Sequence, residues 1–116
     1  MEMLSHKPEN VHKQMLKHML STFLLWLISK KPMHGYELIK TVEKDGGFKI
    51  VTASKVYPIL KSLTRKGLID HEKQAQGRRI KKIYHITDKG KMALKRIRMC
   101  LFESELKRQF LKEMTT

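Results

Sequence analysis

Nine lysine and arginine side chains lie between Thr52 and Tyr84, where two acidic residues accompany them. The cations are Lys55, Lys61, Arg65, Lys66, Lys73, Arg78, Arg79, Lys81 and Lys82, and the acids are Asp70 and Glu72. The difference of +7 is half of the formal net charge of +14. Such a set can bind phosphate, because Lys and Arg donate charge-assisted hydrogen bonds to phosphate oxygens. A nucleic acid is the first candidate partner, and an anionic membrane surface is the second.

The acidic and histidine side chains do not predict a catalytic or metal site. Glu103 and Glu105, two residues apart, point to different sides of a helix and cannot work as a pair. His6, His12 and His18 recur every six residues, whereas a helical metal-binding pair needs a spacing of four. The sequence also lacks a glycine-rich loop that could cradle phosphate. We therefore expect no enzyme, no metal and no cofactor.

The composition is that of one folded domain. A chain of 116 residues with 41% hydrophobic residues has the size and composition of a single globular unit. Its single cysteine, Cys100, excludes an internal disulfide, fits a reducing compartment and is expected to be a small buried residue. The apolar run "FLLWLI" is far shorter than the ~20 residues that span a bilayer, and no secretory signal is visible. We expect a cytoplasmic protein that does not enter a membrane.

Helical periodicity predicts two helices in the first part of the chain, after a flexible arm over residues 1–11. The first helix begins at about Val11 and ends before Pro32. Its apolar residues form one stripe of Leu16, Leu20, Phe23, Leu24, Leu27 and Ile28 and a second stripe of Met15, Met19 and Trp26. The second helix covers about Gly35 to Asp45, and a β-prone segment follows at 48–51. The expected buried side of the second helix is Tyr36, Leu38, Ile39 and Val42.

A third helix, with a basic outer face, is predicted to end at Gly67. Its inward stripe is Val56, Ile59, Leu60 and Leu63. Pro58 lacks the N–H of a helical hydrogen bond, so its place depends on where the helix begins. If Ser54 is the N-cap, Pro58 falls at the fourth helical position and is accommodated, whereas a cap at Thr52 requires a distorted first turn. In either case, hydroxyl and amide groups gather at a helix start, where an anion binds well.

A β-hairpin and a last helix complete the predicted elements. The strands are expected at 68–74 and 78–87, joined around 75–77. Alternation places Ile80, Lys82, Tyr84 and Ile86 on one face of the second strand and Arg79, Lys81, Ile83 and His85 on the other. Tyr84 is expected in the core. The last helix follows Thr87 as its N-cap.

Three helices, a basic hairpin and a terminal helix form the winged helix-turn-helix arrangement. In it, the third helix enters the major groove of DNA and the hairpin, or wing, touches the flanking backbone. We expect bases to be read by Ser54, Lys55, Tyr57 and Lys61, with Thr52 and Arg65 toward the backbone. The wing residues Arg78, Arg79 and Lys81 would hold flanking phosphate or enter the minor groove.

Three residues with ring side chains near the helix starts are further candidate contacts. His34 could cap the second helix or reach a phosphate, and capping is the simpler role. Tyr57 could belong to the core, but its place off the inward stripe favours a phosphate or base-edge contact. Tyr36, two residues after His34, is included among the candidate DNA contacts.

Two longer stretches carry a family resemblance. The segments "KKPMHGYELIKTVEKDGGFKIVTASKVYPILKSLTRKGLI" and "GRRIKKIYHITDKGKMAL" resemble the PadR family of transcriptional regulators across about Leu24 to Leu94. The shared marks are Pro-x-His-Gly-Tyr-Glu-Leu, Tyr-Pro in the third helix, Gly-Leu-Ile, the basic wing, and Tyr-x-Ile-Thr-x-x-Gly. The resemblance implies a homodimeric DNA-binding regulator, usually a repressor, with a dimerising C-terminal helix. In many members a small effector relieves repression.

The terminal helix gives separate support for a homodimer. A helix of about 26 residues would be a rod of about 40 Å, longer than one small domain can cover. Its apolar stripes are Leu94, Ile97 and Leu101, and Met99, Phe102, Leu106 and Phe110. The uncovered part, together with Met15, Met19 and Trp26 of the first helix, suits a two-fold partner. This surface could close fully dry or leave a cavity for a hydrophobic effector, and folding of the helix back on its own core is the alternative.

The overall prediction is a mainly α fold with a small β-wing: a winged helix-turn-helix with an added N-terminal helix and a long C-terminal dimerisation helix. The arm occupies 1–11, the DNA-binding domain 12–86 and the dimerisation helix 87–116. We expect a sequence-specific regulator of transcription, most simply a repressor, that binds double-stranded DNA. The alternatives are an architectural protein that coats DNA without sequence preference and an adaptor that docks to an acidic protein.

Overall fold

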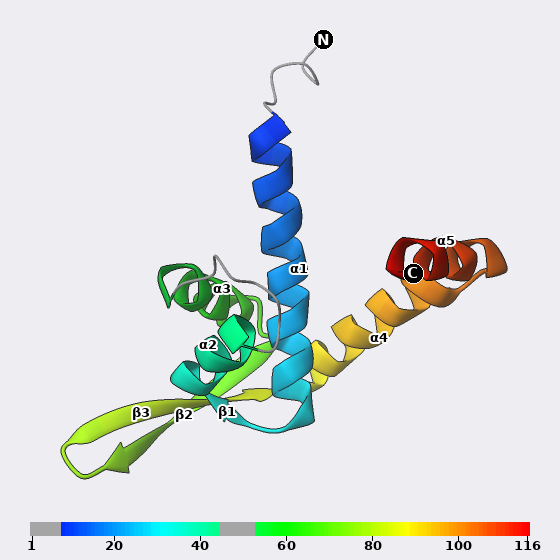
Figure 1. Cartoon of the computed structure of the whole chain (residues 1–116). Helices are drawn as coiled ribbons and strands as arrows, with labels where there is room; N and C mark the ends of the chain where they lie inside the picture. The colour runs from blue at the N-terminus through cyan, green and yellow to red at the C-terminus, as the bar shows by residue number, and fades with distance from the viewer. Residues whose placement is uncertain (1–7, 45–52) are drawn as a thin grey trace.

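The computed structural model describes residues 8–44 and 53–116. Its elements are α1 (Pro8–Lys30), β1 (Met33–His34), α2 (Gly35–Lys44), α3 (Ala53–Arg65), β2 (Ile69–Gln76), β3 (Arg79–Ile86), α4 (Asp88–Phe102) and α5 (Glu105–Thr115). Figure 1 shows α1 as an upright rod, with α2 and α3 beside its lower half. The hairpin of β2 and β3 projects to one side, and α4 and α5 lead away on the other. The predicted winged-helix fold, mainly α with a small β-wing, is confirmed.

The first helix begins earlier than the sequence indicated. It starts at Pro8 rather than near Val11, because proline has a suitable φ and needs no N–H partner at the first helical position. The predicted arm of residues 1–11 is therefore helical from Pro8, and residues 1–7 lie outside the described residues. The β-prone segment 48–51 lies outside them as well.

A three-stranded sheet in the order β1-β3-β2 forms the base of the wing. The short β1 pairs with β3 through Met33 to Tyr84 and His34 to Ile83. The longer β2 pairs with β3 from Ile69 opposite Ile86 out to Gln76 opposite Arg79. The strands thus extend to a tighter turn than the predicted loop at 75–77. Gly77, with φ of 61°, begins this turn, where a left-handed conformation favours glycine.

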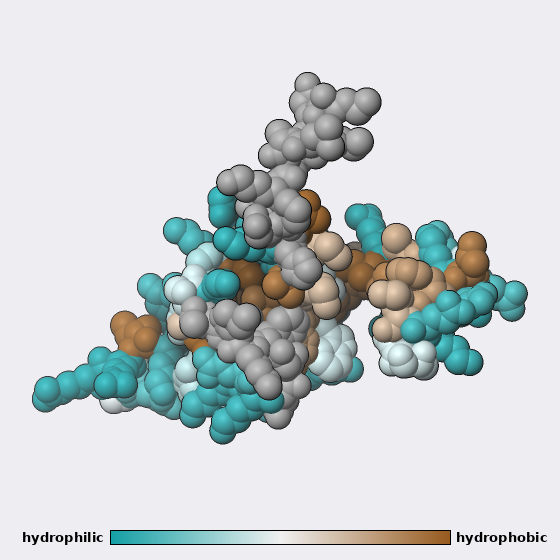
Figure 2. Space-filling view, turned by 45° about the horizontal axis from the view of Figure 1, so that its top comes forward, coloured by the Kyte–Doolittle hydropathy of each residue, from teal (hydrophilic) through white to brown (hydrophobic). Residues whose placement is uncertain are grey.

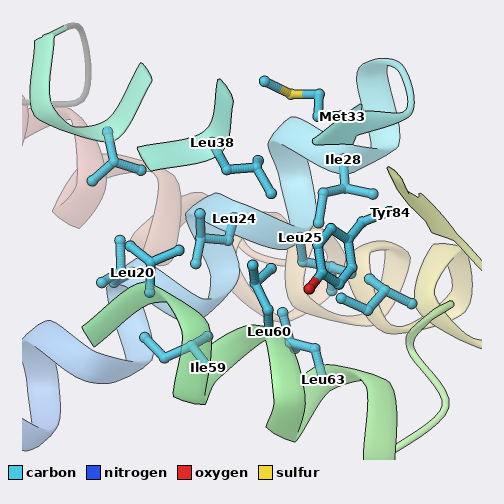
Figure 3. Close-up of a cluster of buried hydrophobic side chains, with 13 residues drawn as sticks. Leu20, Leu24, Leu25, Ile28, Met33, Leu38, Ile59, Leu60, Leu63 and Tyr84 are labelled. Atoms are coloured by element: carbon cyan, nitrogen blue, oxygen red, sulfur yellow. The ribbon is translucent and has the colours of Figure 1, made fainter. Parts of the chain in front are cut away.

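The core lies between α1, α2, α3 and the sheet (Figure 3). Its buried side chains are Leu20, Leu24, Leu25, Ile28, Met33, Leu38, Val42, Val56, Ile59, Leu60, Leu63, Ile69 and Tyr84. The predicted inward stripe of α3 and the predicted core position of Tyr84 are both confirmed. Burial of each large apolar side chain contributes about 1.5–3 kcal/mol, so this cluster fixes how α3 is held against the body.

Some residues of the predicted apolar stripes and faces are exposed. The α1 stripe is covered only from Leu20 onward, where Phe23 and Leu27 are half-buried and its other members are buried. Leu16 is 48% exposed because the N-terminal half of α1 extends beyond the other elements (Figure 1). Ile80 is 70% exposed, because it pairs with Ala75 near the end of the hairpin, where no helix covers the strand. Tyr36, predicted on the buried side of α2, is 44% exposed.

The predicted single terminal helix is two helices. Thr87 caps α4 as expected, and its hydroxyl accepts the Gly90 N–H at 3.1 Å. However, α4 ends at Phe102, and Ser104 caps a new helix by accepting the Lys107 N–H at 3.2 Å. A serine side chain that bonds to the backbone in this way favours a helix start over continuation. The uninterrupted rod of about 40 Å is therefore wrong.

The start of α4 lies tightly against Gly67 and Leu68, the two residues before β2. A Cβ added at Gly90 would be 2.1 Å from the carbonyl oxygen of Leu68, so only glycine fits there without movement. The Thr87 hydroxyl also donates to the carbonyl of Gly67 at 2.6 Å. These contacts fix the direction in which α4 leaves the domain.

Candidate nucleic-acid interface

The outer face of α3 carries the predicted base-reading residues. Ser54, Lys55, Tyr57 and Lys61 are exposed, as is Arg65. Because the opposite face is buried in the core, α3 can present only this side to a ligand. Thr52, predicted to face the DNA backbone, lies outside the described residues.

The wing brings cations together without acidic neighbours near its tip. Arg78 and Arg79 are exposed at the turn, and Figure 2 shows mostly hydrophilic side chains over this hairpin, at the left of the view. Lys73 lies directly opposite Lys82 in the register, and both are exposed. Like charges directly opposite each other destabilise an antiparallel pair. An anion bound here would remove that repulsion.

Tyr57 is partly exposed and packs against the start of α2, so it does not belong to the buried core. Its ring packs on the start of α2, where a Cβ added at Gly35 would be 3.0 Å from Tyr57 Cε1, yet 47% of the residue is exposed. Burial raises the pKa of the neighbouring Tyr84, and the Tyr57 hydroxyl raises it further. Tyr57 therefore joins α2 to α3 and still offers part of its ring to a ligand.

His34 occupies the capping position of α2. The Glu37 carboxylate accepts the backbone N–H of His34 at 3.0 Å and lies 2.7 Å from His34 Nδ1. This is the return half of a capping box. The backbone hydrogen bond from His34, followed by the side-chain one, lowers the pKa of Glu37. His34 Nε2 lies 3.1 Å from Gln74 Oε1 on β2. The capping bond therefore comes from the Glu37 side chain, and a phosphate contact by His34 stays a prediction.

Tyr36 and Lys81 form a contact that the sequence did not predict. The Tyr36 ring stacks on the His34 ring with centroids 5.6 Å apart. Lys81 Nζ lies 4.7 Å from the Tyr36 centroid, and Lys40 Nζ lies 5.9 Å from it. Lys81 is half-buried, unlike the exposed arginines of the wing tip. A pair separated by 45 positions has no local sequence signal, so only the fold reveals it.

A groove between α1 and α4 contains most of the predicted dimerisation residues. Its volume is about 710 Å³, and its lining includes Met19, Phe23, Trp26, Ile97, Leu101 and Phe102. Met19 and Trp26 are 58% and 46% exposed. Figure 2 shows apolar patches on the α4 and α5 side of the molecule, at the right. The groove is thus an apolar surface that the described part of the chain leaves uncovered.

Other predicted dimerisation residues lie outside the groove. Met15 is 60% exposed on the free half of α1, while Leu106 and Phe110 are 75% and 60% exposed on α5. Cys100 is exposed on α4, contrary to the expected burial, because this part of α4 has left the core. Among residues 8–44 and 53–116, no three His, Cys, Asp or Glu side chains are placed to hold a metal ion. No helix in the same ranges is both long and apolar enough to cross a membrane.

Known proteins share this sequence and fold. Residues 24–96 match the family described as "Transcriptional regulator PadR-like family". The chain is 36% identical over 73 residues to the negative transcriptional regulator PadR of Bacillus subtilis, a match that covers 61% of this chain and 40% of that protein. The chain therefore spans less than half of the length of this curated relative.

Solved structures extend the likeness to nearly the whole chain. A PadR-like transcriptional regulator from Bacillus cereus has a TM-score of 0.71 and 30% identity, covering 89% of this chain and 97% of its own. The structure of Bacillus subtilis PadR in complex with operator DNA has a TM-score of 0.60 and 35% identity, covering 65% of this chain and 44% of its own.

Proposed function

Because the chain belongs to the PadR-like family of transcriptional regulators, we propose that it binds double-stranded DNA sequence-specifically as a homodimer and represses transcription. The observation that carries the proposal is the set of exposed cations on the outer face of α3 and on the wing, where Lys73 opposes Lys82. The similar Bacillus subtilis PadR was solved with operator DNA, which supports the same ligand here. No catalytic activity is proposed, and DNA as the ligand favours the cytoplasm as the compartment.

In this proposal, α3 enters the major groove. Ser54, Lys55, Tyr57 and Lys61 contact base edges, while Thr52 and Arg65 contact the backbone. Arg78 and Arg79 hold flanking phosphate or enter the minor groove. Two of the predicted contacts, His34 and Tyr36, lie beside the wing, where His34 contacts Gln74 and Tyr36 contacts Lys81.

The homodimer is proposed to form through α1 and α4. The apolar groove between these helices is unusual for a monomer, because contiguous exposed apolar surface of this kind marks an interaction site. A second copy would cover Met19, Trp26 and Phe102 and place two α3 helices on one duplex. A small hydrophobic effector is proposed to bind in whatever part of this groove the second copy leaves open, and so to relieve repression.

Selection of bound duplexes from a random pool tests the proposal. We expect an inverted repeat whose half-sites lie about one DNA turn, roughly 34 Å, or a multiple of it apart. A salt titration then compares the selected duplex with random duplex. Equal binding to both would replace the regulator with an architectural DNA-binding protein, and no binding to either would favour an adaptor for an acidic protein.

A further inference from the structure

Two side chains at the start of α2 connect the body of the domain to one rung of the wing. His34 Nε2 lies 3.1 Å from Gln74 Oε1 on β2, and the Tyr36 ring lies 4.7 Å from Lys81 Nζ on β3. Gln74 and Lys81 are direct partners in the antiparallel register. We call these four residues, His34, Tyr36, Gln74 and Lys81, the wing clamp.

The clamp acts where the sheet itself stops supporting the wing. The last pair between β1 and β3 is His34 with Ile83, so the hairpin continues as two strands from there to the turn at Gly77. Two-stranded ribbons twist strongly and are marginally stable alone. The Gln74–Lys81 rung lies beyond that last pair, so the clamp extends the support of the body further along the ribbon.

The same turn of α2 also contacts the recognition helix. His34 reaches β2, Gly35 packs against the Tyr57 ring of α3, where an added Cβ would lie 3.0 Å from Cε1, and Tyr36 reaches β3. Three consecutive residues therefore touch the two elements that would bind DNA. This segment therefore links the wing to α3, in addition to the direct packing of α3 against β2 and β3 in the core.

We propose that Tyr36 and His34 are positioning residues that set the angle of the wing relative to α3, so that Arg78 and Arg79 meet flanking phosphates at a fixed place. The Glu37 carboxylate lies 2.7 Å from Nδ1 of the His34 ring, which leaves Nε2 of the imidazole directed at Gln74. The Tyr36 ring, which stacks on His34, holds the Lys81 ammonium group by a cation–π contact. The proposal rests on DNA binding by the wing, and it assigns Tyr36 a role through Lys81 in place of direct contact with DNA.

The first experiment is a double-mutant cycle on the selected duplex. Tyr36→Ala should weaken binding about three- to tenfold and lower the slope of log K against log salt, although tyrosine carries no charge, because the wing arginines are no longer held in place. In an Arg78→Ala/Arg79→Ala background, Tyr36→Ala should have almost no further effect. Tyr36→Phe should bind like wild type, since the ring is kept. Additive effects, or a Tyr36→Phe effect as large as that of Tyr36→Ala, would show direct contact with DNA and overturn the proposal.

The second experiment needs no DNA and uses a matched pair of lysines. Lys81 and Lys40 both lie near the Tyr36 ring, at 4.7 Å and 5.9 Å, but Lys40 belongs to α2 itself. Amide hydrogen exchange at residues 74–81 should become several-fold faster in Tyr36→Ala, Lys81→Ala and Gln74→Ala, and stay unchanged in Lys40→Ala. Thermal unfolding of each variant shows whether the fold is kept. If Tyr36→Ala does not fold, Gln74→Ala tests the clamp by removing its side chain on β2 instead.

The two experiments separate this proposal from the proposed function. If wild type binds no duplex, the regulator function fails, and hydrogen exchange still decides whether the clamp holds the wing. If wild type binds its selected duplex but Tyr36→Ala keeps the same affinity, salt slope and exchange rates, the clamp alone is overturned.

Discussion

Glu37 illustrates how one carboxylate at a helix start stabilises the fold in a pH-dependent way. Its pKa is lowered below the ordinary 4.5, first by the backbone hydrogen bond from His34. A lowered pKa in the folded state means that the stabilisation is present at neutral pH and is lost as the pH falls below about 4.5 through the folded value. Glu37→Gln should reduce the free energy of unfolding at pH 7 by about 1 kcal/mol or less, as for removal of a cap.

Urea denaturation of wild type and Glu37→Gln at pH 7 and at pH 3 measures this difference. Glu43→Gln, which removes the same charge from the exposed side of α2, is the control and should have little effect. A destabilisation of equal size at both pH values would mean that the ionised carboxylate is not its source.

For Gly90→Ala, helix propensity and packing predict changes of opposite sign in the free energy of unfolding. Helix propensity alone would make Gly90→Ala stabilising by about 1 kcal/mol. The added Cβ, however, would lie 2.1 Å from the Leu68 carbonyl oxygen, so we expect a destabilisation of about 1–3 kcal/mol or more from overpacking. Thermal or urea unfolding measures it, with the exposed Lys91→Ala in the same helix as control. An increase in stability would mean that Gly90 does not lie as close to Leu68 as described.

The roles of single residues were predictable from the sequence where periodicity or cap chemistry determines them. The inward stripe of α3, the core position of Tyr84 and the Thr87 cap follow from periodicity and cap chemistry. Tyr36 and Ile80 did not follow, because alternation and helical spacing indicate which residues share a face but not how far the neighbouring elements extend over that face. Ile80 lies past the edge of the body, and Tyr36 faces the hairpin.

At the scale of elements, α3 should separate sequence reading from backbone binding. Lys55→Ala or Tyr57→Phe should cost about 1–3 kcal/mol on the selected duplex and much less on random duplex, because base-edge contacts exist only on the preferred site. Arg65→Ala should weaken both alike. Binding titrations at constant salt measure these costs, and equal costs for all three variants on the two duplexes would mean that α3 only grips the backbone.

The wing should contribute affinity without sequence choice. Arg78→Ala or Arg79→Ala should lower the slope of log K against log salt by about one unit for each phosphate that a subunit no longer neutralises. Lys95→Ala, on the exposed side of α4, is the matched removal of one cation away from the proposed surface. An unchanged slope in the double arginine variant would remove the wing tip from the DNA interface.

Element order and type were predictable from hydrophobic period and turn residues, but some boundaries were not. The first strand of the hairpin extends into the predicted loop because Gln76 can pair with Arg79 once Gly77 takes a positive φ. The break after α4 depends on the Ser104 hydroxyl bonding to the Lys107 N–H. The free energies of a new helix start at Ser104 and of one continuous helix differ only slightly. The apolar spacing of Phe102, Leu106 and Phe110 fits both, so it does not reveal the break.

At the scale of the whole molecule, the proposed homodimer should depend on the groove between α1 and α4. Phe102→Glu should shift the equilibrium toward monomer, because dimerisation would bury an unpaired charge. Sedimentation over a concentration series measures the change, and Lys95→Glu provides a charge control on the exposed side of α4. A variant that remains as dimeric as wild type would contradict the assignment. Leu106→Glu then tells whether α5 takes part.

The opposed lysines of the wing also affect how the protein responds to its solution. Dissolved ions screen Lys73 from Lys82 and weaken the self-repulsion of a chain with net charge +14. The same ions compete with lysine and arginine for the phosphates of DNA. Rising ionic strength therefore has opposite effects on the free protein and on the complex: it stabilises the folded free protein and weakens its binding to the duplex. A buffer chosen to keep the purified protein folded and in solution is a poor buffer in which to look for its binding site.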